Sequence, residues 1–196
     1  VDDNSFQKLI PGWSVNIDES ADPVKSHLRD LAMVKLIYYY GGIVMPSSTI
    51  VMKNIKNMYY NMCNKKGCFV GELLSEGNVS ETIEFFPSSR FIGCKKNNPV
   101  IREVMLYLEQ LNDYSSEYEF KSKINRFLFK LVHENKMGKI DGKFLGSKTR
   151  NNKKVSIEDL MSDTNIHFDD NVNVIVLPDN DLLKRTKYNW FVRLNT

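Results

Sequence analysis

The stretch that most constrains the fold is residues 26–52, SHLRDLAMVKLIYYYGGIVMPSSTIVM. Within residues 31–40 only Lys35 interrupts an apolar surface, which predicts a helix that is buried on most of its sides. Gly41 and Gly42 come next, and paired glycines allow the positive φ angles with which a chain turns sharply at a helix end. A short apolar run follows them. We therefore expect a buried helix that leads into a central strand, with a ligand-binding loop after that strand.

The same stretch resembles the core of glycosyltransferases of the GT-A fold that carry an Asp-x-Asp motif, the capsular-polysaccharide and mannosyltransferase-like group. The resemblance rests on Tyr40-Gly41-Gly42 and on Asp30 at the family's spacing before the glycines. In that family an Asp and an Arg before the glycines contact the sugar, and the Asp pair after the strand holds a divalent metal on the nucleotide diphosphate. Here Met33 stands at the Arg position, and Pro46 and Ser48 stand at the two Asp positions.

The resemblance implies an α/β fold of the GT-A (Rossmann-like) type, with a mostly parallel central sheet flanked by helices. The early alternation of β and α patterns favours the same class. We expect one domain over residues 1–196 with a basic-aromatic C-terminal element at 179–196. The chain begins without the first strand that such a fold needs, which predicts an N-terminally incomplete fragment.

Other elements are predicted from periodicity and from turn residues. Helices are expected at 98–111, where Asn98 is the predicted N-cap, at 120–133, and as a short turn after Ser156. Strands are expected at 13–17, 49–52, 69–70, 85–86, 91–94 and 172–177. Polar turns or surface segments are expected at 53–60, 63–67, 87–89 and 137–146, and an exposed basic hairpin tip at 148–154.

Composition excludes several classes of protein. The 42% hydrophobic and 26% charged content is ordinary for a globular domain, and no apolar run approaches the roughly 20 residues of a membrane helix. The net charge of +3 is mild, and no nucleic-acid module is recognisable, so we expect no specific nucleic-acid partner. Three cysteines without a second ligand pair at zinc spacing predict reduced thiols rather than a metal site.

The chemistry of a sugar transferase requires that a diphosphate leaving group be neutralised, commonly by Mg²⁺ or Mn²⁺ held on carboxylates. Pro46 offers no side-chain ligand and Ser48 only a neutral hydroxyl, so no metal and no cofactor are expected. The candidate residues for nucleotide-sugar binding are Asp30, Ser47, Ser48, Lys184 and Arg185. No catalytic residue can be assigned. An alternative remains open, in which these residues form a metal-independent active site, and Mg²⁺ or Mn²⁺ would be needed only under that alternative.

Three segments together narrow the resemblance: YYYGGIVMPSS, FIGCKKNNP and LPDNDLLKRTKYNWFVR. They resemble glycosyltransferase-like proteins of large DNA viruses of protists and algae, in which Pro-Ser-Ser replaces Asp-x-Asp. The resemblance implies a degenerate transferase with a non-catalytic binding or structural role in a virus particle, as a minor capsid or other virion protein. Its implied partners are other virion proteins and a nucleotide sugar, and its implied location is the virus particle or the host cytoplasm. The alternative is an active nucleotide-sugar-dependent glycosyltransferase.

Overall fold

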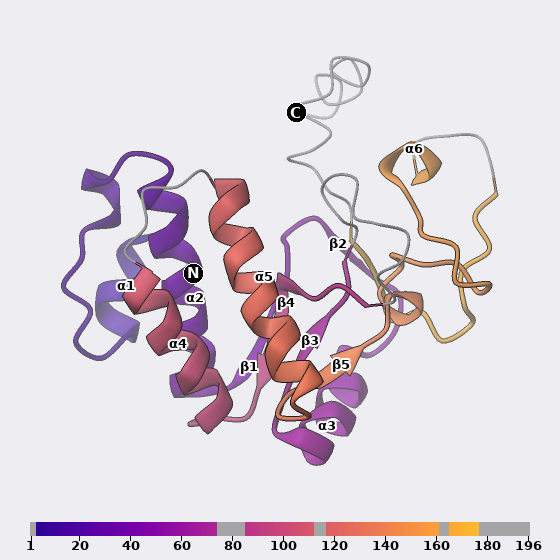
Figure 1. The fold of residues 1–196 in the computed structure, drawn as a ribbon, viewed down its shortest axis with the longest axis horizontal. Coiled ribbons are helices and arrows are strands. Elements are labelled where there is room, and N and C mark those ends of the chain that lie inside the picture. The colour runs from indigo at the N-terminus through magenta and orange to yellow at the C-terminus, as the bar shows by residue number, and fades with distance from the viewer. Residues whose placement is uncertain (1–2, 74–84, 112–116, 161–164, 177–196) are drawn as a thin grey trace.

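A computed structural model describes residues 3–73, 85–111, 117–160 and 165–176. Figure 1 shows helices packed around a small sheet. The described helices are α1 (Asp3–Leu9), η1 (Ile17–Glu19), α2 (Val24–Tyr40), α3 (Ile55–Lys66), α4 (Pro99–Leu111), α5 (Glu117–His133), η2 (Gly142–Phe144) and α6 (Ile157–Leu160). The described strands are β1 (Gly42–Val44), β2 (Thr49–Val51), β3 (Cys68–Gly71), β4 (Ser88–Cys94), β5 (Gly138–Ile140) and β6 (Val174–Val176).

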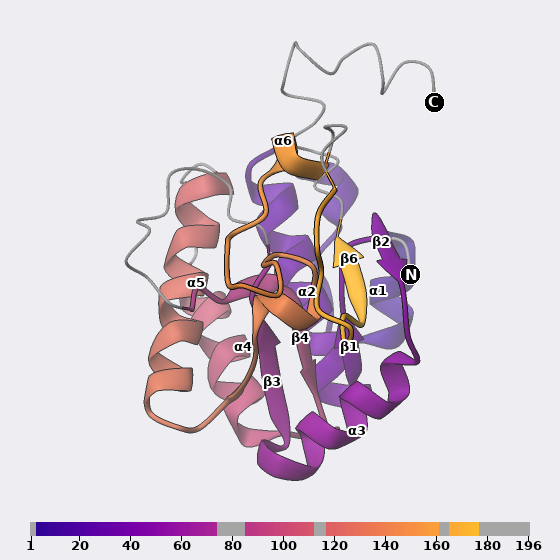
Figure 2. The same ribbon diagram turned by 90° about the vertical axis from the view of Figure 1, so that its right-hand side faces the viewer.

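The main sheet has the strand order β1-β4-β3-β5. β4 pairs antiparallel with both β1 and β3, whereas β3 and β5 are parallel. Three of these strands therefore point the same way, and β4 opposes them. The protein is a mixed α/β structure, and the expected mostly parallel sheet is not confirmed. A separate two-stranded antiparallel sheet joins β2 to β6 (Figure 2).

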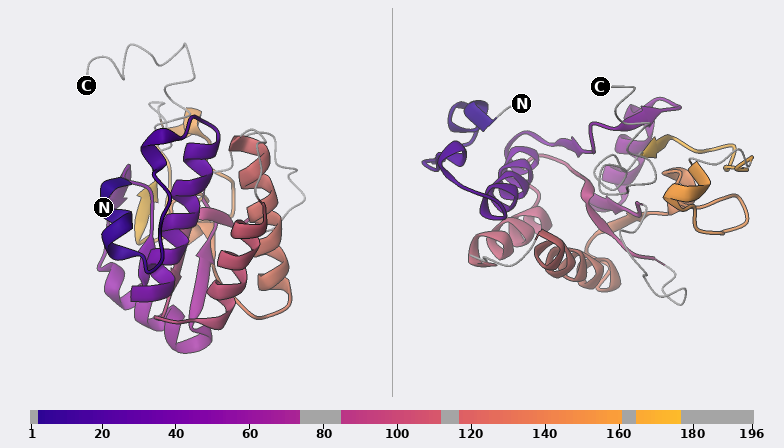
Figure 3. Two further views of the ribbon diagram at one scale, coloured as in Figure 1. Left: turned by 90° about the vertical axis from the view of Figure 1, so that its left-hand side faces the viewer. Right: turned by 90° about the horizontal axis from the view of Figure 1, so that it is seen from above.

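The main sheet is covered on both faces, which gives three layers. Seen from above, α2, α4 and α5 lie on one side of the sheet and α3 lies on the other (Figure 3, right). Successive side chains of a strand point to opposite faces, so Cys68 and Val70 pack with the three helices while Phe69, between them, packs with α3. A smaller cluster docks α1 on the outer side of α2. No described helix combines the length and the apolar character needed to cross a bilayer.

The helix of the opening motif is confirmed, but its strand lies elsewhere than expected. α2 ends at Tyr40 and is capped by Gly41, whose φ is 75°, and Gly42 follows with a φ of 118°. A side chain at Gly41 would meet the backbone nitrogen of Lys96 at 3.1 Å, so glycine is also needed for close approach. The expectation that the next strand is central is wrong: β1 is the edge of the described sheet and is only half-buried.

The predicted strand at residues 13–17 is wrong. This segment is a loop followed by η1, and α1 precedes it. The alternation was misleading because Val15 is exposed, while Trp13 and Ile17 pack with Phe6 and Ile10 against α2. These four apolar residues form one cluster without any strand pairing.

Helix α3 was also missed, because residues 53–60 and 63–67 were predicted to be a surface segment and a turn. Its apolar residues recur at helical spacing and form part of the core: Ile55, Met58, Tyr59, Met62 and Cys63. The Asn54 side chain accepts a hydrogen bond from the Lys56 amide at 2.9 Å, and Gly67 ends the helix with a φ of 76°. Both end signals were present in the sequence.

Two further turn predictions are corrected. Ser88 and Ser89 begin β4 rather than a turn, because β4 extends to pair with β3 at Gly71. The segment 137–146 contains β5 and η2, since its backbone pairs in parallel with β3. The strands at 49–52, 69–70 and 91–94 and the capping contacts between Ser156 and Asp159 are confirmed. The strand expected at 172–177 is present as β6 over Val174–Val176, and residue 177 lies outside the described residues. The strand expected at 85–86 is wrong, because Phe85 and Phe86 lie in the segment that precedes β4.

The three cysteines are buried and carry free thiols, as predicted. Burial raises the pKa of Cys68 to about 12, and it also raises the pKa of Cys94. The Sγ of Cys94 donates to the carbonyl of Ile37 at 3.1 Å. These thiols therefore act as small apolar groups of the core, because the reactive thiolate form is disfavoured.

The contribution of the N-cap of α4 to stability can be measured by substitution. The Asn98 side chain accepts hydrogen bonds from the amides of Val100 at 3.0 Å and Ile101 at 3.1 Å, as predicted from Asn-Pro. We expect Asn98→Ala to lower the free energy of unfolding by about 1 kcal/mol, because two amides at the helix start lose their acceptor. Urea unfolding followed by circular dichroism measures the loss. Asn98→Asp keeps an acceptor and should lose less; an equal loss in both variants would show that the cap is not the cause.

Candidate functional site

Three residues of the transferase-like motif, Asp30, Met33 and Pro46, line one pocket of about 190 Å³. Asp30 and Met33 come from α2, and Pro46 comes from the turn after β1. The first two lie on the same face because they are three residues apart on a helix. Pro46 reaches the pocket because β1 runs alongside β4, with Val44 opposite Ile92. The fold therefore brings together Asp30 and Met33, at the two positions that contact the sugar in the resembled family, with Pro46, at the first of the two positions that hold the metal there.

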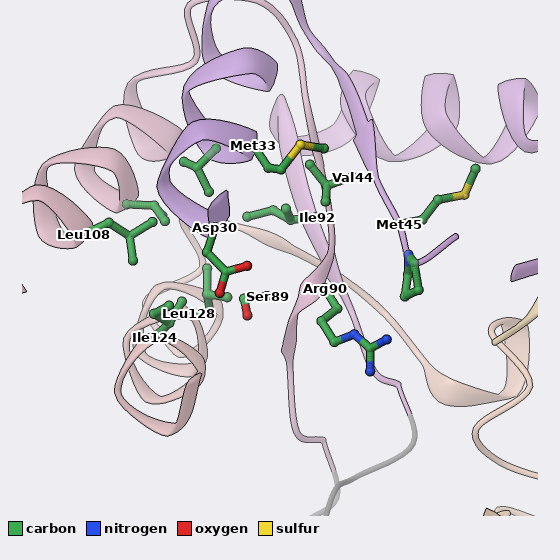
Figure 4. A pocket seen from close by; sticks show the side chains of 13 residues that line it. Asp30, Met33, Val44, Met45, Ser89, Arg90, Ile92, Leu108, Ile124 and Leu128 are labelled. Carbon is green, nitrogen blue, oxygen red and sulfur yellow. The ribbon is translucent and has the colours of Figure 1, made fainter. Parts of the chain in front are cut away.

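Two further polar residues line this pocket and were missed in the sequence. Ser89 and Arg90 lie in the first half of β4, and the Ser89 amide donates to Asn125 Oδ1 on α5 at 2.9 Å. In Figure 4 the Asp30 carboxylate points toward Ser89, whereas the guanidinium of Arg90 points away from it. In the sequence these two residues belong to a short polar run before the apolar half of β4. Such a run is equally typical of a turn, so it did not indicate a site. The pocket thus holds one carboxylate, one guanidinium and one hydroxyl.

The rest of the pocket is apolar. Ten of its thirteen lining residues carry no polar side-chain group, and they come from α2, β1, β4, α4 and α5 and from the turn after β1. Its volume lies below the roughly 300 Å³ at which ligand pockets for drug-sized molecules begin, and above the roughly 150 Å³ that accommodates benzene. Such a space suits a fragment the size of one ring more than a complete nucleotide sugar.

The other predicted site residues are not brought to this pocket. Ser47 is exposed and Ser48 half-buried in the turn between β1 and β2, and neither lines the pocket. Lys184 and Arg185, with the whole C-terminal element 179–196, lie outside the described residues. Lys95 and Lys96 follow the far end of β4, beyond Cys94, and do not line it either.

The donor set of the pocket does not fit the metal that the resembled family uses. Mg²⁺ and Mn²⁺ prefer several oxygen ligands, usually with more than one carboxylate. Among the described lining residues Asp30 supplies the one carboxylate, and Pro46 supplies no side-chain oxygen. Within the described ranges no group of three His, Cys, Asp or Glu side chains is placed to hold a metal ion.

A second polar cluster lies at the carboxyl end of β3. Glu72 and Lys148 form an ion pair of 2.7 Å, and both side chains are less than one-tenth exposed. The Glu72 carboxylate also accepts the amides of Gly142 at 3.1 Å and Phe86 at 3.3 Å, and Ser147 Oγ donates to the Glu72 carbonyl. Lys148 was predicted to lie on an exposed hairpin tip. The hairpin is confirmed by the pairing of Lys148 with Lys154, but Lys148 itself is buried by its ion pair.

This second cluster is built for support rather than for catalysis. Its carboxylate is enclosed and already receives an ammonium group and two backbone amides. It ties β3, the segment before β4, η2 and the 148–154 hairpin together. The pocket beside Asp30 therefore remains the candidate site.

Comparison of the chain with protein-family models, with curated proteins and with solved structures found no match in any of the three. The glycosyltransferase resemblance thus stays a prediction that rests on the motif residues.

Proposed function

We propose that this protein is a degenerate GT-A glycosyltransferase-like protein with a non-catalytic binding or structural role. The observation that carries the proposal is the shared pocket of Asp30, Met33 and Pro46. Under this proposal the pocket descends from a sugar site, and two of its three motif positions now carry the apolar side chains of Met33 and Pro46. A place among the proteins of a large DNA virus particle, with other virion proteins as partners, is part of the same proposal and rests on the resemblance alone.

The chemistry of the pocket favours binding over transfer. A leaving diphosphate develops negative charge, which must be stabilised by a metal or by directed cations. Met33 replaces a guanidinium by a thioether, and Pro46 replaces a carboxylate by a ring without donors or acceptors. What remains is a mostly apolar space in which Arg90 points away from Asp30, while Asp30 and Ser89 form one part of the wall, where hydrogen bonds can orient a small ligand (Figure 4).

One observation favours the alternative of an active, metal-independent transferase. Arg90 lines the same pocket as Asp30 and carries a permanent positive charge. A guanidinium can bind phosphate through two parallel hydrogen bonds and could offset part of the charge that a metal would neutralise. Under this alternative Asp30 would position the sugar and Arg90 would bind the diphosphate.

The test is isothermal titration with UDP- and GDP-sugars, in Mn²⁺ and in EDTA, together with an assay of sugar-nucleotide hydrolysis. We expect no micromolar binding that depends on Mn²⁺ and no turnover, because the metal ligands are missing. Micromolar, metal-dependent heat would overturn the proposal. Turnover in EDTA that falls at least tenfold in Asp30→Asn and in Arg90→Gln, but not in the exposed control Arg126→Gln on α5, would establish the alternative.

A further inference from the structure

A second pocket, of about 770 Å³, lies where the C-terminal ends of α3 and α5 meet the start of β5. The C-terminal ends of α3 and α5 lie toward the bottom of the ribbon in Figure 2. The Lys66 ammonium connects α3 to the turn that follows α5 by donating to the Asn135 carbonyl at 3.0 Å. This second pocket shares no lining residue with the pocket beside Asp30. We call it the basic-aromatic pocket and define it by Lys65, Lys66, Phe85, Phe129, His133 and Lys139.

The charges of this pocket are of one sign. They are the ammonium groups of Lys65 and Lys66 in the last turn of α3 and of Lys139 in the middle of β5. The His133 ring comes from the last turn of α5. No Asp or Glu is among the described residues that line the pocket. The nearest acid along the chain, Glu134, forms ion pairs with Lys136 at 3.1 Å and Lys130 at 3.8 Å, and none of these three lines the pocket.

Stabilisation of helix ends explains only part of this arrangement. Basic residues in the last turn of a helix interact favourably with the helix dipole, which accounts for Lys65 and Lys66. It does not account for Lys139, which lies in a strand, with its ammonium 5.4 Å from the centroid of the Phe85 ring. That contact places a cation at the boundary between the polar rim and the apolar floor.

The apolar part of the pocket presents aromatic faces. Phe85 is buried, whereas Phe129 is 43% exposed although it is a large apolar side chain. The Phe129 and His133 rings are close to parallel, with an interplanar angle of 8° and centroids 6.4 Å apart. Exposed aromatic faces next to cations are suited to a planar ligand that carries negative charge.

We propose that the basic-aromatic pocket binds a small anion with an aromatic body, of the class of aryl phosphates. The phosphate would accept hydrogen bonds from Lys65, Lys66 and Lys139, and the ring would pack on Phe129 and His133. The volume of the pocket falls within the roughly 300–1,000 Å³ of typical small-molecule sites. This inference does not depend on the function proposed for the pocket beside Asp30.

The test uses three probes in isothermal titration at low salt: 1-naphthyl phosphate, 1-naphthol and inorganic phosphate. We expect 1-naphthyl phosphate to bind at least tenfold more tightly than either of the others, because only this probe uses both the cations and the aromatic faces. If inorganic phosphate binds as tightly as 1-naphthyl phosphate, the aromatic rings do not contribute and the proposal is wrong. Naphthol that binds as tightly would show that the cations are not used.

Matched variants locate the binding. Lys65→Gln and Lys139→Gln should each weaken binding of 1-naphthyl phosphate by about threefold to tenfold, as expected for partly exposed charge-assisted hydrogen bonds. The control Lys130→Gln changes the net charge equally but lies outside the pocket, and Asp30→Asn alters the other site; both should bind as the unchanged protein does. An equal loss in Lys130→Gln would overturn the proposal, and so would tighter binding of a single-stranded oligonucleotide through the same lysines.

Phe129→Ala separates the aromatic contribution from the charge. Because this side chain is partly exposed, the variant should fold, which a urea unfolding curve checks. We expect the variant to bind 1-naphthyl phosphate at least threefold more weakly and to bind inorganic phosphate with unchanged affinity. Unchanged binding of 1-naphthyl phosphate would overturn the assignment of the ring site.

Discussion

Replacing Lys148 by methionine is expected to lower the free energy of unfolding by about 3 to 5 kcal/mol. The substitution removes the ammonium from an enclosed ion pair of 2.7 Å and leaves the Glu72 carboxylate buried without its countercharge. The loss of a surface ion pair, in contrast, costs at most about 1 kcal/mol. Urea unfolding, followed by circular dichroism and by tryptophan fluorescence, measures the change.

The matched control is Lys153→Met in the same hairpin, where the side chain is exposed. We expect its effect to stay within about 0.5 kcal/mol, as for most surface substitutions. A similar small change in Lys148→Met would show that water reaches Glu72 and that the ion pair is not enclosed. The comparison thus tests burial itself and not the loss of a positive charge.

A double-mutant cycle then assigns the energy to the pair. Glu72→Gln removes the charge but keeps an amide oxygen that can accept a hydrogen bond from Gly142 or Phe86. The double variant Glu72→Gln with Lys148→Met should lose less stability than the sum of the single losses, because the second substitution no longer leaves a buried charge alone. Strict additivity would contradict a direct interaction.

Replacing Phe69 by alanine is expected to lower the free energy of unfolding by about 3 to 5 kcal/mol, the usual range for a buried phenylalanine. Phe69 is fully buried in β3, in the cluster that joins α3 to β4, β5 and β6. Its partner in the register is Gly93, and a Cβ at Gly93 would lie 2.4 Å from the Phe69 ring. The ring therefore fills the space above the glycine, and its removal leaves a cavity that the strands cannot close.

The reciprocal change tests the same contact from the other strand. Gly93→Ala should lower the free energy of unfolding by about 1 to 3 kcal/mol through overpacking. Combined with Phe69→Ala, the added methyl group enters the vacated space, so the double variant should be more stable than the sum of the two losses predicts. The control Phe129→Ala, at a partly exposed ring, should lose far less than Phe69→Ala. Equal losses at Phe69 and Phe129 would contradict the packing described here.

Elements with strong signals at their own ends could be predicted from the sequence. Asn98-Pro99 marks the start of α4, and Gly41-Gly42 marks the end of α2, because capping and positive φ depend on a few neighbouring residues. Helix α3 had signals of the same kind at Asn54 and Gly67 and could have been predicted. Its lysine- and asparagine-rich surface hid a regular apolar spacing.

The candidate site could be predicted only in part. Asp30 was identified because its motif is continuous in the sequence, and it does line a pocket. Arg90 was missed because it reaches that pocket through the pairing of β4 with β1, which no local pattern encodes. Ser48 belongs to the motif but lies in a turn that does not line the pocket.

The sequence by itself determined the mixed α/β class, the helices α2, α4 and α5, and the strand positions near residues 69 and 92. These follow from periodicity, capping and residue identity, which act over a few residues. The tertiary structure alone decided that β1 lies at the edge of the described sheet, that Lys148 is buried against Glu72, and that Arg90 joins Asp30 at one pocket. Each of these depends on contacts between segments far apart in the chain, because strand order and burial are settled by the packing of the whole core.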